Sequence, residues 1–146
     1  MNTTTNLPPL ANKLLFLGIL LFLFGLLIGL FIPILANARM GLSAHLEGIM
    51  NGIFLVVLGL LWNKLDLSQK WLKRTYALTI YGSFANFAAV TIAAITGAGK
   101  MMPLAGGKDG AAWAEGLISF LLLSLSLVMI AVCCLVLAGL YRAFRE

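Results

Sequence analysis

The chain has 146 residues, of which 62% are hydrophobic and only 10% are charged, and its formal net charge is +5. So few charged residues supply too little polar surface to cover a water-soluble globule of this size. The ten Lys and Arg residues are spread over the ends of apolar runs rather than gathered with aromatic residues on one face, so nucleic acid is excluded as a partner. We expect a single membrane domain, residues 1–146, in contact with a lipid bilayer.

Four apolar runs follow one another, and each is long enough for the roughly 20 helical residues that cross a bilayer core of about 30 Å. The predicted transmembrane helices cover about residues 11–35, 42–62, 71–96 and 112–141. The predicted fold class is therefore an all-α integral membrane protein with four transmembrane helices in each protomer.

The connection over residues 97–110 is rich in glycine and contains Lys100 and Lys108. A phosphate-binding loop would need a Gly-Lys-Ser/Thr step that follows a strand, and the sequence offers neither the strand nor the hydroxyl residue. We therefore expect a flexible loop at the membrane surface.

Basic residues indicate the orientation in the membrane, because Lys and Arg accumulate in the short loops on the cytoplasmic side. The amino end, the second connection and the carboxyl end lie on one side and hold seven cations: Lys13, Lys64, Lys70, Lys73, Arg74, Arg142 and Arg145. The other side holds three: Arg39, Lys100 and Lys108. The bias predicts an integral protein of a cytoplasmic membrane with both termini in the cytoplasm.

Three polar residues stand close together near the start of the second apolar run. His45, the single histidine of the chain, is followed by Glu47 and Asn51. Polar groups at membrane depth are costly unless paired, so such residues are candidates for function as well as for hydrogen bonds between helices. With about 3.6 residues per turn, His45 shares one stripe with Gly48 and Gly52, while Glu47 and Asn51 share another.

The glycines beside His45 have two compatible interpretations. Gly48-xxx-Gly52 has the spacing that lets a second helix approach closely. A flat cofactor also needs a surface without side chains next to its axial ligand. One imidazole can hold a haem iron and leave the opposite coordination position open, whereas zinc would require three or four ligands.

The third and fourth apolar runs carry further polar residues. Asn86 is deep enough in its helix to need a hydrogen-bond partner, and Tyr81 is adjacent to the face that Asn86 occupies. Serines in the fourth run are expected to bond to the backbone or to a neighbouring helix. Glu115, at the start of that run, is expected to be interfacial and solvated.

The stretch Arg39-Met-Gly-Leu-Ser-Ala-His45-Leu-Glu47-Gly-Ile-Met-Asn51-Gly52, in a chain with four apolar runs, resembles the hydroxylaminobenzene mutase family. That family is similar to styrene oxide isomerase, which pairs a histidine with an asparagine six residues later, as His45 and Asn51 are paired here. The resemblance implies a homotrimer that holds ferric haem b between protomers. It makes His45 the axial iron ligand, with Gly48 and Gly52 beside the cofactor, and Asn51 a substrate contact.

The third run departs from the isomerase pattern, which has an Asp, an Asn and a Tyr four residues apart. Setting that Asn on Asn86 places Gly82 and Val90 at the other two positions, although Tyr81 lies beside the first. The departure implies another substrate and another proton relay, as the mutase reaction would require.

By this resemblance the chain converts hydroxylaminobenzene to 2-aminophenol, an isomerisation that requires no external electron donor. Ferric iron on His45 is expected to act as a Lewis acid on the hydroxylamine N–O bond. Asn51 or Asn86 is expected to hold the N–H or O–H group, and Glu47 or Tyr81 to move the ring proton.

Two other functional classes remain open. A haem-carrying electron-transfer subunit would also use one membrane histidine, with Met40 or Met50 as a sixth ligand, and its spectrum would not respond to small ligands. A small transporter subunit would line a polar path with His45, Glu47 and Asn51, and it would purify without colour.

Overall fold

The computed structural model describes residues 8–106 and 108–145, and within these ranges the chain is helical. The prediction of four membrane-crossing helices is confirmed, because each long helix has the length and hydropathy needed to span a bilayer. The helices are α1 (Pro9–Phe31), α2 (Ala38–Leu61), α3 (Gln69–Thr96) and α4 (Ala112–Ala143). Three short 3₁₀ segments accompany them: η1 (Ile32–Ile34), η2 (Trp62–Lys64) and η3 (Pro103–Ala105).

Local chemistry sets the boundary between α1 and α2. Pro33 lies in η1, which follows directly on α1, and a proline cannot donate a backbone hydrogen bond. Asn37 caps the next helix, since its Oδ1 accepts a hydrogen bond of 3.1 Å from the backbone N–H of Met40. α2 therefore begins at Ala38, about one turn before the predicted start at residue 42.

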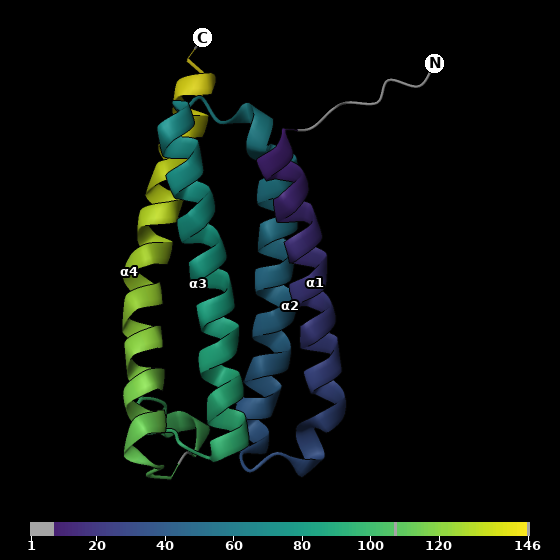
Figure 1. The fold of residues 1–146 in the computed structure, drawn as a ribbon, viewed down its shortest axis with the longest axis vertical. Coiled ribbons are helices and arrows are strands. Elements are labelled where there is room, and N and C mark those ends of the chain that lie inside the picture. The colour runs from purple at the N-terminus through teal and green to yellow at the C-terminus, as the bar shows by residue number, and fades with distance from the viewer. Residues whose placement is uncertain (1–7, 107, 146) are drawn as a thin grey trace.

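The helices form a row rather than a closed four-helix bundle. α1 packs on α2, α2 on α3, and α3 on α4, so that α1 and α4 lie at opposite edges of the row (Figure 1). The start of α1 and the end of α4 lie at the same end of the molecule, and the α3–α4 loop lies at the other end.

Glycines bring α1 and α2 into close contact. A Cβ atom built on Gly48 would lie 2.5 Å from the Cα of Gly25, and one on Gly52 would lie 2.7 Å from the carbonyl oxygen of Gly18. Small residues at such positions let two backbones approach, which gives helices in a membrane the dispersion contacts that hold them together.

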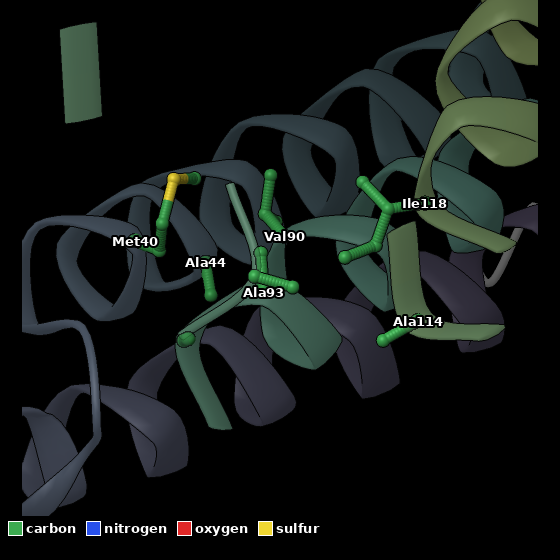
Figure 2. Packing of buried hydrophobic residues seen from close by; sticks show 8 residues of the cluster. Met40, Ala44, Val90, Ala93, Ala114 and Ile118 are labelled. Atoms are coloured by element: carbon green, nitrogen blue, oxygen red, sulfur yellow. The ribbon is translucent and has the colours of Figure 1, made fainter. Parts of the chain in front are cut away.

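A hydrophobic cluster joins α2, α3 and α4 near the α3–α4 loop. Figure 2 shows Met40 and Ala44 from α2, Val90 and Ala93 from α3, and Ala114 and Ile118 from α4. Five of the eight buried residues in the cluster are alanines, so the three helices meet closely at this end. The cluster therefore holds α2, α3 and α4 together at this end of the molecule.

Large apolar side chains cover the outside of the row. Leu30 at the end of α1 is 75% exposed, and Leu127 in the middle of α4 is 73% exposed. Such a surface would be unfavourable in water but suits the hydrocarbon of a bilayer.

Candidate active site

Glu47, Asn51 and Asn86 form one hydrogen-bonded group, which we call the Glu47 cluster. The Oε2 atom of Glu47 accepts a 2.9 Å hydrogen bond from Nδ2 of Asn51 and a 2.5 Å bond from Nδ2 of Asn86. Asn51 lies one turn after Glu47 on α2, and it also donates a 2.9 Å bond to the backbone oxygen of Glu47. α3 supplies Asn86, which thus has the partner that its depth in the helix requires.

Beside this cluster lies a cleft of about 640 Å³ between α2, α3 and the α3–α4 loop. Its volume is within the range of about 300–1,000 Å³ that small-molecule sites have. Glu47 and Asn86 supply polar groups on one wall. The other lining residues are mainly apolar and include Met40, Val90, Leu122 and the segment Met101–Ala105.

Asn51 stands behind Glu47 rather than in the cleft. Its side chain is only 9% exposed, it is absent from the cleft lining, and its amide is committed to Glu47. Within one protomer the amide of Asn51 therefore orients the carboxylate, while Asn86 lies on the cleft lining.

His45 lies on the opposite face of α2, against α1. Its Nδ1 atom is 2.8 Å from the backbone oxygen of Gly25. Gly29 makes room for the ring, because a Cβ atom at that position would lie 2.6 Å from Nδ1. α1 thus fixes the orientation of the imidazole through two glycines.

The bond to Gly25 also decides which ring nitrogen can bind a metal. A carbonyl oxygen only accepts hydrogen bonds, so Nδ1 must carry the proton, and in the neutral ring Nε2 keeps its lone pair. No described residue hydrogen-bonds to Nε2. Metal-ligating histidines commonly have this arrangement, with the second ring N–H donated to a carbonyl. The hydrogen bonding of His45 therefore leaves Nε2 able to bind a metal ion.

The described residues of one protomer supply no set of ligands that could enclose a metal ion. No three His, Cys, Asp or Glu side chains come together within residues 8–106 and 108–145. His45 is therefore the candidate for a single axial bond.

The two groups of polar residues point away from each other. Residues two apart on a helix differ by about 200° in direction, so His45 faces α1 while Glu47 faces α3. The expected open floor of Gly48 and Gly52 is covered by α1 and leaves no surface for a flat cofactor inside the protomer. The close-packing interpretation of these glycines holds.

Tyr81 does not reach the Glu47 cluster. Its hydroxyl lies 2.6 Å from Oγ of Ser124 on α4, because five helical residues separate Tyr81 from Asn86 by about 140°. The two positions that depart from the isomerase pattern, Gly82 and Val90, also have apolar surroundings or face an apolar wall. Gly82 receives the side chain of Met129, and Val90 lines the cleft.

The two candidate sixth ligands have different surroundings within the protomer. Met40 is 2% exposed and packs in the hydrophobic cluster on the cleft side of α2, and Met50 is 61% exposed.

Sequence reasoning missed several residues of the cleft. Ser43 precedes Glu47 by one turn and lines the same cleft, so the four-residue spacing would have found it. Arg39 lies one further turn back, again on the lining. Residues Met101–Ala105 could not have been found in this way, because only the fold brings the α3–α4 loop over α2.

The similarity of this chain to known proteins extends over most of its length. The profile of a family described as styrene oxide isomerase matches residues 10–141. The chain is 50% identical to hydroxylaminobenzene mutase HabB of Ectopseudomonas oleovorans over 145 residues, which are 98% of this chain and 88% of the relative. It is 42% identical to hydroxylaminobenzene mutase HabA of the same organism over 127 residues, or 86% of this chain and 94% of the relative. No solved structure matches significantly.

Proposed function

Since this chain belongs to the styrene oxide isomerase family, we propose that it is a membrane isomerase that converts hydroxylaminobenzene to 2-aminophenol. Two relatives that match most of its length bear the name hydroxylaminobenzene mutase. The observation that carries the proposal is the Glu47 cluster, a carboxylate held by two amides beside a largely apolar cleft.

The reaction breaks the N–O bond, forms a C–O bond at the ortho carbon, and moves one proton from that carbon to nitrogen. Atoms and electrons balance, so neither an oxidant nor a reductant is consumed. The chain must therefore hold an aromatic ring, orient an N–OH group, and supply a base that also returns the proton.

We assign the role of that base to Glu47. Asn51 and Asn86 both donate to Oε2, and no described residue donates to Oε1, which remains available to a proton of the substrate. Asn86 lines the cleft and can also contact the N–H or O–H group, while the apolar wall holds the ring and excludes water.

His45 would hold haem b through Nε2, and ferric haem, when bound, would supply a Lewis acid for the hydroxylamine oxygen or nitrogen. This assignment is supported by the free Nε2 and by the bond that fixes Nδ1 on Gly25.

A closed ring of three copies would reconcile the opposite directions of His45 and Glu47. A cyclic trimer joins two different faces of the same chain at each interface. We infer that the His45 face of one protomer meets the cleft of the next, so that each site draws on two protomers. The basic residues further support a cytoplasmic membrane location with both termini in the cytoplasm.

The test is conversion of hydroxylaminobenzene by the purified protein in detergent, followed by chromatographic detection of 2-aminophenol. Glu47→Gln keeps the shape of the side chain but removes the base, and we expect kcat to fall about 100-fold or more. Asp66→Asn is the matched control, because Asp66 is an exposed carboxylate in the α2–α3 connection. A wild-type protein that forms no 2-aminophenol would overturn the proposal, and an unimpaired Glu47→Gln would remove the role of Glu47.

A further inference from the structure

The α3–α4 loop forms the outer wall of the cleft. Its segment Met101–Ala105, which includes η3, lines the cleft opposite Glu47 and Asn86. The sequence predicts a flexible loop, but the structure shows one that is hydrogen-bonded at its base and at its crest. The position of this wall relative to Glu47 sets the width of the cleft.

Glu115 holds the base of the loop. Its Oε1 atom accepts hydrogen bonds from the backbone N–H groups of Gly110 at 2.9 Å, Gly99 at 3.2 Å and Lys100 at 3.4 Å. Its Oε2 atom accepts a second bond from Lys100 at 3.2 Å. The carboxylate is half-buried and charge-assisted in these bonds, so it differs from the solvated interfacial residue expected from the sequence.

The two arms of the loop are tightly packed where Glu115 holds them. The backbone N–H of Lys108 donates to the oxygen of Gly97 at 3.3 Å, and that of Gly99 donates to the oxygen of Lys108 at 3.2 Å. Gly110 has no space for a side chain, because a Cβ atom there would overlap Ala98. A shift at this base would therefore move the rest of the loop.

The crest of the loop is attached to α2 more weakly. Nδ2 of Asn37 donates to the oxygen of Ala105 at 3.4 Å, and Nη1 of Arg39 donates to the oxygen of Leu104 at 3.5 Å. Both bonds are longer than three of the four bonds to Glu115, so Glu115 constrains the loop more closely than α2 does.

We propose that Glu115 is a positioning residue that sets the distance of the Met101–Ala105 wall from the Glu47 cluster and so determines the fit of the aryl ring. This inference rests on the proposed function. The N–OH end of a monocyclic arylhydroxylamine meets Glu47 and Asn86, and its ring lies against Met102, Val90 and Leu122. Glu115 touches none of these atoms and acts through the loop.

Glu115→Ala tests the role in kinetics. We expect the KM for hydroxylaminobenzene to rise about tenfold while kcat changes less than about twofold, because ring contacts are lost but Glu47 is retained. Glu115→Gln keeps one carbonyl oxygen for the N–H groups of Gly99 and Gly110, and its KM should fall between those of the wild type and Glu115→Ala. Asp66→Asn, which removes an equal charge from an exposed position, should leave both constants unchanged.

A double mutant separates positioning from general damage. If Glu115 acts through the wall, Glu115→Ala should add little to the KM of a Met102→Ala variant, whereas independent effects would multiply. Amide hydrogen exchange over residues 97–111 should also be faster in Glu115→Ala, whatever the activity of the protein. If Glu115→Ala does not fold, Glu115→Gln is compared with and without Met102→Ala.

The outcomes distinguish the two proposals. A wild-type protein that does not convert hydroxylaminobenzene overturns the proposed function, and the role of Glu115 in substrate fit falls with it. An active wild type with an unchanged KM in Glu115→Ala overturns the positioning role alone. Unchanged hydrogen exchange in residues 97–111 overturns the anchoring of the loop.

Discussion

At the scale of single residues, His45 shows how a neighbouring helix selects the chemistry of a side chain. His45 belongs to α2, but the backbone oxygen of Gly25 in α1 accepts a hydrogen bond from Nδ1 and so requires that this nitrogen carries the proton. The sequence alone identified His45 as the candidate iron ligand. It could not identify Gly25 as the acceptor, because every residue has a backbone oxygen and the residue type does not show which one accepts the bond.

The haem assignment makes a spectroscopic prediction. The purified wild-type protein should contain haem with a Soret band, and His45→Ala should lose most of this haem because the axial bond is absent. Tyr81→Phe is the control, since Tyr81 bonds to Ser124 on the α3–α4 face and should not affect haem content. The measurement is a pyridine haemochrome assay per mole of protein. An active protein that purifies without haem would contradict the assignment and leave the isomerase proposal standing.

The Glu47 cluster also separates what the sequence predicts from what only the fold shows. Glu47 and Asn51 are four residues apart, so their pairing could be predicted from helical spacing. That Asn86 bonds to the same oxygen required the register between α2 and α3, which spacing within one helix does not contain. Glu115 was misjudged for a related reason, because its partners are all backbone N–H groups of a loop.

At the scale of the helices, the α1–α2 contact depends on the absence of side chains. The sequence predicted four helices because long apolar runs in a membrane have few alternatives. The glycine stripe left two interpretations open, since an approaching helix and a flat cofactor both need a smooth surface. The structure places α1 there, with Gly25 against Gly48.

Gly48→Ala should therefore destabilise the protein. The new methyl group would lie 2.5 Å from the Cα of Gly25, where only backbone movement can relieve the overlap. We expect a loss of about 1–3 kcal/mol, measured as a lower Tm in detergent by circular dichroism. Gly116→Ala is the matched control, because a Cβ atom at Gly116 would meet nothing within 4 Å. Equal Tm values for the two variants would contradict the packing role of Gly48.

At the scale of the whole molecule, His45 and the cleft lie on different faces of α2, since His45 contacts α1 and the cleft opens toward α3 and the α3–α4 loop. Polar groups on two faces of α2 would by themselves favour an oligomer only where one protomer cannot supply partners for both faces. The structure satisfies both faces within the described residues, through Gly25 for His45 and through Asn51 and Asn86 for Glu47. The proposal of a ring of three copies therefore rests on the opposite directions of His45 and Glu47 and on the resemblance to the family.

Coexpression of two inactive variants tests the shared site. His45→Ala supplies an intact Glu47, and Glu47→Gln supplies an intact His45, so every mixed ring of three would contain one site with both residues. Equal random mixing should restore about a quarter of the wild-type activity. The measurement is 2-aminophenol formation per mole of protein in the whole purified mixture, without selection for rings that contain both variants. Activity no higher than that of either variant alone would show that each site lies within one protomer.

The opposite orientation of His45 and Glu47 also bears on how the enzyme is made. Under the proposal that each site is shared between two protomers, a newly inserted chain would hold half of two different sites and no complete one. Its onset of activity would then coincide with assembly, and a bound arylhydroxylamine would not be activated on a solitary chain exposed to surrounding lipid. Turnover in the membrane would follow the local density of copies, so dilution into a larger bilayer area would itself act as a switch.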